Sequence, residues 1–351
     1  MIRIESQTQF YRNKKGGLSK KAKVISSEEY EKFASKNDDW IKVQEIPCGK
    51  CIGCRLDYSK TWATRAMLEA SQWEQNYFIT LTYDDEHKPY NWQMPDLETG
   101  QIYTDPGDWN GYLKPDDMKH FMYRLRTDYA RKFKHRKIRM MYCGEYGEDT
   151  KRPHYHAILF NMPIPAEELK VYKQTYSKDY LYTWDWLTEE WGKGNVIIAE
   201  VTWNTCAYVA RYMCKKQKGP TSSEYYASRG QTPEFMRVSN RPGLARQYYE
   251  EHKQEIYAGD ELIIKGRNGK PVSIKPPKYF DNLFKEFNEE YLEELKERRS
   301  EACHTSEVLK GKTTTLKKAR RLEIEERSIK ARTTALKRNQ LDLDSKTKAK
   351  K

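Results

Sequence analysis

Residues 138–162, IRMMYCGEYGEDTKRPHYHAILFNM, place a polar loop between two short apolar stretches. The stretches 138–144 and 155–162 have the length and composition of β-strands. The second is apolar at successive positions, which predicts that both of its faces are buried in the middle of a sheet. The eight residues YGEDTKRP between the stretches suit a hairpin loop. This segment therefore predicts an antiparallel sheet.

The flanking sequence predicts further strands and helices. The runs YFITLTY and NVIIAEVTW are rich in β-branched and aromatic residues, and they predict strands at 77–83 and 195–203. Apolar periodicity and terminus signals predict helices at 59–74, 115–132, 166–176 and 184–191, and one after 203 that Asn204 or Thr205 caps. This order of elements favours an α+β fold, an antiparallel sheet with helices packed on one face.

Composition divides the chain into four segments. Residues 1–45 are polar, with one short helix expected at 26–33. Residues 46–245 hold the sheet, and 84–114 form a long Pro-, Gly- and Asp-rich excursion within it. Residues 246–275 connect to a charged, helical segment at 276–351. From Lys310 onward there are 15 Lys and Arg against 5 Asp and Glu, so this tail is either a solvated helix or a salt-sensitive DNA contact.

Charge and hydropathy restrict the class of protein. The 351 residues carry a net charge of +13, which indicates an anionic partner such as nucleic acid. Mean hydropathy is −1.00, and no segment approaches the roughly 20 apolar residues of a membrane helix. The stretch MIRIESQTQFYRNKKGG has charges where a signal peptide needs an apolar run. We therefore expect reduced thiols in a cytoplasm and no membrane association.

A triplet HYH at 154–156 begins the second strand of the hairpin. His154 and His156 project from one face of that strand, because side chains alternate along it. If Glu145 lies opposite His154, its carboxylate joins both imidazoles; a different register would bring Glu148 or Asp149 instead. Such a three-ligand site with open positions suits Mg²⁺ or Mn²⁺, and Zn²⁺ is compatible. Two strand histidines alone are more often only packed, so the prediction depends on the carboxylate and on the tyrosines described next.

Two tyrosines stand four residues apart in NTCAYVARYMCKK, residues 204–216. On a helix Tyr208 and Tyr212 share a face, about 40° apart and about 6 Å along the axis. Such pairs usually belong to a core, but this helix has few large apolar residues. A phenol attacks phosphate when a metal polarises the phosphate and a cation stabilises the developing charge. Lys215 shares the tyrosine face, with Arg211 and Lys216 as alternatives for that cation.

Three cysteines are packed into CGKCIGC near the amino terminus. The two-residue spacings of Cys48, Cys51 and Cys54 match thiolate ligation of a structural Zn²⁺. A fourth ligand is not evident, and the fold would have to supply Cys143, Cys206 or His87. Thiols that bind no metal are the alternative interpretation.

Three segments in this order resemble the motifs of the rolling-circle replication initiators, the HUH endonucleases: FITLTYD (Phe78–Asp84), RPHYHAILF (Arg152–Phe160) and YVARYMCKK (Tyr208–Lys216). Together with the paired tyrosines, PCGKCIGCRL and RVSNRPGLAR make the chain resemble the replication initiation proteins of Microviridae, small single-stranded DNA phages, of the gokushovirus type. The resemblance covers about 46–245 and implies a ferredoxin- or RRM-like core. Tyr155, between the histidines, is bulkier than is usual in this family. The motif does not fix the third metal ligand.

The resemblance implies a mechanism with two phenols. One tyrosine attacks a phosphate at the viral replication origin, keeps the 5′ end as a phosphotyrosyl ester and releases a 3′-OH for a host DNA polymerase. The second cuts the regenerated site, and the freed 3′-OH closes a single-stranded circle. The chain has no G-x-x-x-x-G-K-[ST] loop, so unwinding would fall to a host helicase in the bacterial cytoplasm. Candidate contacts to single-stranded DNA are Lys151, Arg152, Arg211 and Lys216.

Other functions remain in competition with this one. Plasmid initiators, relaxases and transposases share the superfamily, but the cysteine cluster and the paired tyrosines favour the phage form. A non-catalytic nucleic-acid-binding or packaging protein would tolerate phenylalanine at Tyr208 and Tyr212. A zinc-stabilised structural protein would unfold on chelation and would not need DNA.

Overall fold

A computed structural model of this chain comprises two compact units, Met1–Arg55 and Leu56–Lys351. The residues that it describes are 2–12, 18–25, 27–34, 36, 40–45, 52–89, 94–95, 102–103, 111–134, 137–147, 150–175, 179–215, 222–227, 230–265 and 271–313. Among these residues, no helix is both long and apolar enough to cross a membrane.

The amino-terminal unit contains a small antiparallel sheet that the sequence did not reveal. Its strands run in the order β2 (Leu18–Ile25), β1 (Ile2–Arg12) and β3 (Trp40–Glu45), with α1 (Ser27–Ala34) between β2 and β3 in the chain. Its described residues form a small apolar cluster: Ile4, Ile25, Tyr30, Phe33 and Trp40. A sheet with so small a cluster gives little hydrophobic periodicity, and we therefore predicted only the helix.

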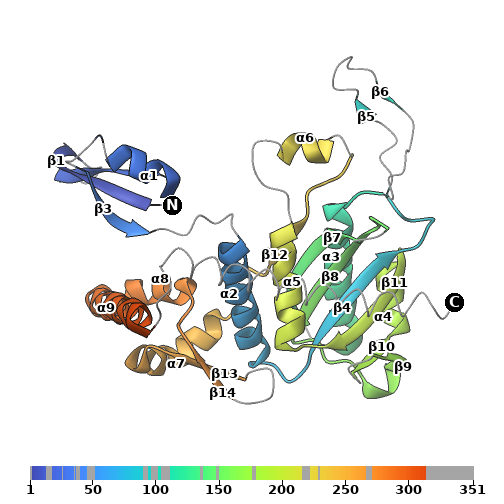
Figure 1. Ribbon diagram of the computed structural model, residues 1–351. Coiled ribbons are helices and arrows are strands. Elements are labelled where there is room, and N and C mark those ends of the chain that lie inside the picture. The colour runs from blue at the N-terminus through green and yellow to red at the C-terminus, as the bar shows by residue number, and fades with distance from the viewer. Residues whose placement is uncertain are drawn as a thin grey trace. The chain divides into compact units, whose positions relative to one another are not determined.

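The larger unit is built on a seven-stranded sheet (Figure 1). All neighbouring strands in it are antiparallel, which confirms the prediction from the hairpin. The order is β12 (Phe235–Val238), β7 (Arg139–Tyr146), β8 (Pro153–Phe160), β4 (Asn76–Tyr83), β11 (Gly194–Glu200), β10 (Tyr180–Thr183) and β9 (Lys170–Gln174). Strand β8 is internal in this sheet, as its continuous apolar sequence indicates.

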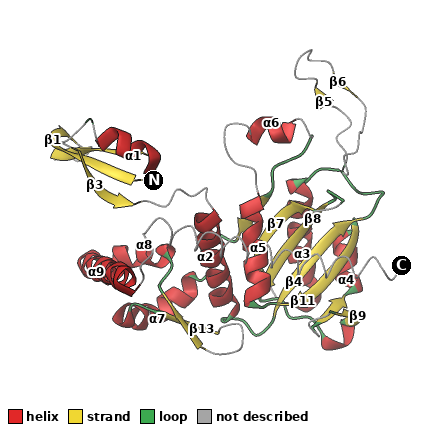
Figure 2. Ribbon diagram, in the orientation of Figure 1, coloured by secondary structure: helices red, strands yellow, loops and turns green. Residues whose placement is uncertain are grey.

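Helices cover both faces of the sheet, whereas we expected them on one face (Figure 2). One face is packed by α3 (Pro115–Phe133) and α4 (Asp185–Trp191), and the other by α2 (Ile52–Ala70) and α5 (Trp203–Lys215). The reason lies in β8, where Tyr155 and Leu159 belong to the first core, and Ile158 and Phe160 to the second. An internal strand that is apolar on both sides needs a covering layer on each.

Three local predictions need correction. The helix expected at 166–176 is a short 3₁₀ turn (Ala166–Glu168) followed by β9, because pairing with β10 overrides the local helical periodicity. Helix α2 begins at Ile52, earlier than the expected residue 59. Helix α5 begins at Trp203, and Thr202 caps it by accepting a hydrogen bond from the Thr205 backbone N–H at 3.2 Å.

The carboxyl-terminal part of the larger unit packs its own core around α7 and α8. Its elements are α6 (Ser222–Ala227), α7 (Arg246–Gly259), β13 (Leu262–Lys265), β14 (Pro271–Ile274), α8 (Lys278–Phe287) and α9 (Glu289–Thr313). Arg299 of α9 joins these elements through ion pairs with Asp260 and Asp281. Two short strands, β5 (Met94–Pro95) and β6 (Ile102–Tyr103), pair within the excursion, and the basic residues after 313 lie outside the described part.

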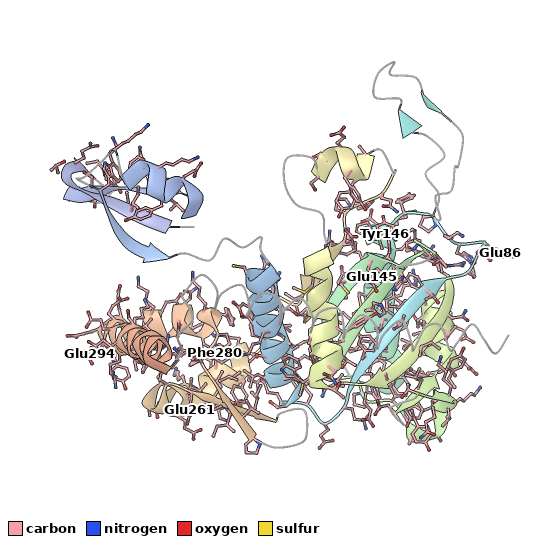
Figure 3. All side chains as sticks on the ribbon, viewed as in Figure 1. Glu86, Glu145, Tyr146, Glu261, Phe280 and Glu294 are labelled. Carbon is pink, nitrogen blue, oxygen red and sulfur yellow. The ribbon has the colours of Figure 1, made fainter. Side chains whose placement is uncertain are left out.

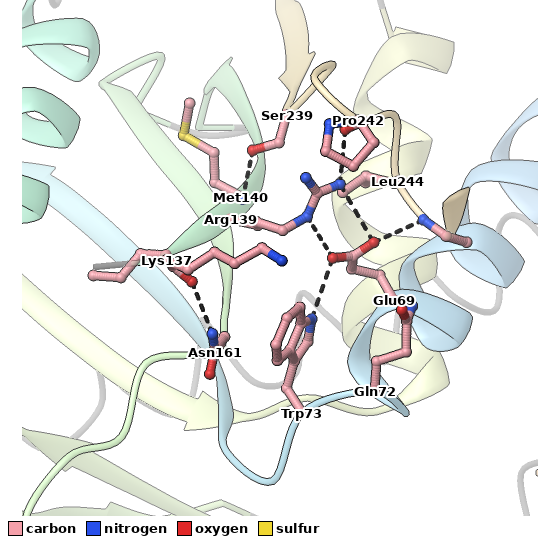
Figure 4. Close-up of polar contacts among 12 residues, drawn as sticks. Glu69, Gln72, Trp73, Lys137, Arg139, Met140, Asn161, Ser239, Pro242 and Leu244 are labelled. Carbon is pink, nitrogen blue, oxygen red and sulfur yellow. Dashed lines mark hydrogen bonds and ion pairs between the residues drawn. The ribbon is translucent and has the colours of Figure 1, made fainter. Parts of the chain in front are cut away.

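A buried ion pair joins α2, β7 and the segment before α7 (Figure 4). Arg139 Nε donates to Glu69 Oε1 at 2.5 Å, and Arg139 Nη2 donates to the Pro242 carbonyl at 2.9 Å. The Ala245 backbone N–H donates to Glu69 Oε2 at 2.7 Å, and Trp73 Nε1 donates to Oε1 at 3.2 Å. One carboxylate therefore ties together three parts of the chain that are far apart in sequence.

Replacing Glu69 with alanine is expected to destabilise the fold by about 3–5 kcal/mol. The change leaves the Arg139 guanidinium and the Ala245 N–H buried without their acceptor. Urea unfolding followed by circular dichroism measures the change. The control is Glu74→Ala, at an exposed position just after the same helix, which is expected within about 0.5 kcal/mol of the unmodified protein. Equal midpoints for both variants would show that the ion pair contributes no net stability.

Candidate metal centre

The hairpin of β7 and β8 brings the candidate metal ligands to one face of the sheet. Glu145 is the cross-strand partner of His154, and Cys143 is the partner of His156. The Gly147 N–H donates to the Arg152 carbonyl at 3.0 Å and closes the loop. Glu145 and the neighbouring Tyr146 lie near the loop end of the hairpin (Figure 3). The register is the one on which the choice of Glu145 depended.

A single carboxylate oxygen lies between the two imidazoles. Glu145 Oε1 is 2.8 Å from His154 Nε2 and 3.0 Å from His156 Nε2. One potential ligand atom from each residue lies within 4.8 Å of the others, and this is the one such group of three found among the described residues. Two imidazole nitrogens and a carboxylate fit a divalent metal ion and leave coordination positions open for substrate.

The Glu145 carboxyl is ionised at neutral pH, although it is only 2% exposed. Burial raises the pKa of this carboxyl, but His154 and His156 lower it by more, through charge and hydrogen bonds, and the net pKa lies well below its usual range. The residue is therefore available as an anionic ligand without a change in its protonation.

Each histidine presents Nε2 to the carboxylate and has a different partner at Nδ1. His154 Nδ1 lies 3.1 Å from the Arg152 carbonyl, and His156 Nδ1 lies 2.9 Å from Thr80 Oγ1. The His156 ring also stacks on Phe78, with 5.5 Å between centroids and 14° between planes. Partners at Nδ1 favour a proton there, which leaves Nε2 with the lone pair that a metal requires.

Tyr155 points away from the metal ligands, to the opposite face of the sheet. It is fully buried in the core under α3, where its hydroxyl donates to the Lys114 carbonyl at 2.8 Å and accepts from the Lys114 N–H at 3.0 Å. A second hydroxyl, that of Tyr83, lies 2.9 Å away. The bulky residue of the triplet therefore serves the core and does not crowd the metal ligands.

Helix α5 places the Tyr208 hydroxyl beside the three ligands. The oxygen is 3.4 Å from His156 Nε2 and 3.5 Å from Glu145 Oε1. The Tyr208 ring meets the His156 ring edge-on, at 4.8 Å between centroids and 89° between planes. Tyr208 also packs against Phe78 in the core between α5 and the sheet, so its ring is held while its hydroxyl reaches the ligands.

Several predicted site residues have side chains outside the described part of the structure. Tyr212, Arg211 and Lys215 belong to α5, but only their backbone is described, and Lys216 follows the last described residue of the helix. Glu148 and Asp149, the alternative metal ligands, also lie outside the described residues. The roles of Tyr212 and of the three cations remain predictions.

The cysteine cluster is described only at Cys54, which lies in α2 and is partly exposed. Cys48 and Cys51 lie outside the described residues, so the zinc site remains a prediction. Of the candidate fourth ligands, Cys143 and Cys206 are buried in the core between α5 and the sheet, and burial raises the pKa of the Cys206 thiol. This shift disfavours the thiolate that zinc binds.

His87 and the two candidate DNA contacts beside the triplet have other surroundings. His87 Nδ1 lies 2.8 Å from Asp84 Oδ1. Arg152 donates to Asp85 Oδ1 at 2.8 Å and to the Tyr83 carbonyl at 2.7 Å, and it thereby holds the end of β4 next to β8. Lys151 is exposed in the hairpin loop. Both roles in DNA contact remain predictions, and for Arg152 such a contact would compete with these bonds.

Sequence reasoning missed the groups that hold the histidines, namely Thr80, Phe78 and the Arg152 carbonyl. The strand period places Phe78 and Thr80 on one face of β4. Only the register of β4 against β8, in which Thr80 is the cross-strand partner of His156, shows which histidine the hydroxyl meets.

Comparison with known proteins places the chain in a family. The model of a family of replication-associated proteins of the ORF2 type matches residues 76–217, which include β4, the hairpin and α5. The replication-associated protein ORF2 of Spiroplasma virus 4 is 34% identical over 76% of this chain and 77% of its own length. The replication-associated protein VP4 of Bdellovibrio phage phiMH2K is 28% identical over 68% of this chain and 67% of its own length.

A third relative extends the same pattern. The replication-associated protein ORF4 of Chlamydia phage 1 is 28% identical over 76% of this chain and 61% of its own length. The chain belongs to this family of phage replication-associated proteins, and the resemblance to the replication proteins of Microviridae-like phages is confirmed. No solved structure is significantly similar to it.

Proposed function

We propose that this chain is the HUH endonuclease that nicks and rejoins the viral origin during rolling-circle replication of a single-stranded DNA phage. The observation that carries the proposal is the Tyr208 hydroxyl, 3.4–3.5 Å from two of the three candidate metal ligands. A nucleophile held beside a metal site is the arrangement that covalent phosphoryl transfer needs. Membership in a family of replication-associated proteins supports the same function.

Glu145, His154 and His156 would hold a divalent ion, Mg²⁺ or Mn²⁺ by the nature of the site. When bound, the ion supplies Lewis-acid polarisation of the scissile phosphate. The phenol oxygen of Tyr208 attacks the phosphorus, the P–O3′ bond breaks, and the proton lost by the phenol is balanced by the proton gained on the 3′ oxygen. The product is a 5′-phosphotyrosyl ester and a free 3′-OH.

Tyr212 would perform the second exchange. It lies one helical turn beyond Tyr208 on α5, so it faces the same side of the helix about 6 Å further along. A second phenol can cut the regenerated origin while the first still holds the 5′ end. The freed 3′-OH then attacks the first ester and closes the circle, and each step conserves one phosphodiester.

The partners follow from this chemistry. The substrate is single-stranded DNA of the viral origin, and a host polymerase extends the released 3′-OH while a host helicase unwinds the duplex. The action takes place inside the host bacterium. The net charge of +13 supports binding to a polyanion, and this contribution weakens as salt rises.

Chelation is expected to abolish covalent capture of DNA. The purified protein is mixed with a labelled single-stranded origin oligonucleotide in Mn²⁺ and run on a denaturing gel, beside a sample with excess EDTA. We expect a band that survives SDS in Mn²⁺ only, because the phosphate is not polarised without the ion. Tight DNA binding with no covalent band in Mn²⁺ or Mg²⁺ would favour the packaging protein instead.

A further inference from the structure

His156 depends on a side chain for its orientation, whereas His154 depends on the backbone. The partner of His154 Nδ1 is the Arg152 carbonyl, which can only accept a hydrogen bond. The carbonyl also accepts from the Gly147 N–H, so the hairpin loop fixes its position. The partner of His156 Nδ1 is the Thr80 hydroxyl at 2.9 Å, a group that a single substitution can remove.

The surroundings of His156 make this hydroxyl hard to replace. The His156 side chain is 6% exposed, against 17% for His154. Phe78 stacks on its face and Tyr208 meets it edge-on, so protein rings occupy the space around the imidazole. A water molecule cannot readily take over the contact at Nδ1 in such a place.

We infer that Thr80 is a positioning residue of the metal centre, which holds His156 with its proton on Nδ1 and its Nε2 lone pair directed to the ion. The inference rests on the proposed metal centre. When Thr80 Oγ1 accepts from Nδ1–H, the neutral ring has one remaining lone pair, on Nε2, next to Glu145. Without that acceptor, the proton moves between the two nitrogens, and part of the population cannot ligate.

The strand supplies a matched control. Thr82 lies two residues further along β4, on the same face, and is the cross-strand partner of His154 just as Thr80 is the partner of His156. Thr82 Oγ1 donates instead to the Asn195 carbonyl at 3.3 Å. Thr82→Val therefore makes the same chemical change in the same strand and leaves the partner of His154 Nδ1 in place.

The experiment measures Mn²⁺ affinity of the full-length protein by calorimetry. Thr80→Val is expected to weaken binding by roughly 10- to 100-fold, the usual effect of removing a partner of a ligating histidine. Thr80→Ser, which keeps the hydroxyl, is expected to restore the affinity to within a few-fold, and Thr82→Val to leave it unchanged. Nitrogen NMR of the metal-free protein provides a second measurement, since Thr80→Val should reduce the Nδ1–H tautomer of His156.

Two results would overturn the inference without touching the metal centre. One is Thr80→Val binding Mn²⁺ as the unmodified protein does while Glu145→Gln loses the ion. The other is an equal loss in Thr80→Val and Thr82→Val, which would indicate a general effect on β4. If the unmodified protein shows no binding that depends on Glu145, the proposed metal centre itself is wrong, and the role of Thr80 falls with it.

Discussion

Tyr208→Phe is expected to lower the rate of covalent capture of origin DNA by roughly 10³-fold or more, because it removes the nucleophilic oxygen. The ring itself should stay in place, since it packs edge-on against His156 and against Phe78. Folding and DNA binding are therefore expected to be unchanged, and the loss should lie in the chemical step.

Tyr212→Phe is the comparison that separates the two phenols. We expect this variant to form the first phosphotyrosyl ester, because Tyr208 is the phenol beside the metal ligands. It should fail to transfer the held strand to a second origin site. The measurement is a gel assay with two oligonucleotides of different length, in which strand exchange gives a hybrid product. Full initial capture by Tyr208→Phe, with none by Tyr212→Phe, would reverse the order of the two phenols.

Glu145→Gln is expected to weaken Mn²⁺ binding by roughly 100-fold or more and to reduce covalent capture accordingly. The amide keeps the shape of the side chain but lacks the negative charge that both imidazoles favour at this position. Excess Mn²⁺ should restore part of the capture, because the two histidines remain as ligands.

The matched control is Glu200→Gln. Glu200 ends β11 and is exposed, and its cross-strand partner Tyr77 packs against the core on the α3 side of the sheet. This change removes one carboxylate from the same sheet and should leave both Mn²⁺ affinity and capture unaltered. Equal losses in the two variants would mean that the charge of the whole domain, rather than a ligand, governs binding.

The sequence predicted the parts of the fold in which hydrophobic pattern and local signals agree. The strand at 77–83, the helix at 115–132 and the hairpin of β7 and β8 match the structure to within a few residues. The segment at 166–176 failed because strand pairing with β10, a contact made later in the chain, outweighs the periodicity of an exposed edge. The amino-terminal sheet was missed because its apolar cluster is too small to impose a pattern.

For the candidate site, spacing within one element was readable and contacts between elements were not. The period of a strand puts both histidines on one face, and the hairpin places Glu145 opposite His154. The contact of Tyr208 with His156 joins residues 52 apart in the chain, and that of Thr80 with His156 joins residues 76 apart. Such contacts depend on the packing of α5 and on the order of strands, which no local pattern specifies.

The alternation along β8 has an evolutionary consequence. His154 and His156 lie on the face of the candidate metal centre, while Tyr155 and Ala157, between and after them, are fully buried in the opposite core. A slip of one residue in this strand would send the imidazoles into the apolar layer and a tyrosine toward Glu145. Descendants of this protein that still fold must therefore keep the histidines on their present face, so changes in host range or origin preference have to arise in segments away from this strand.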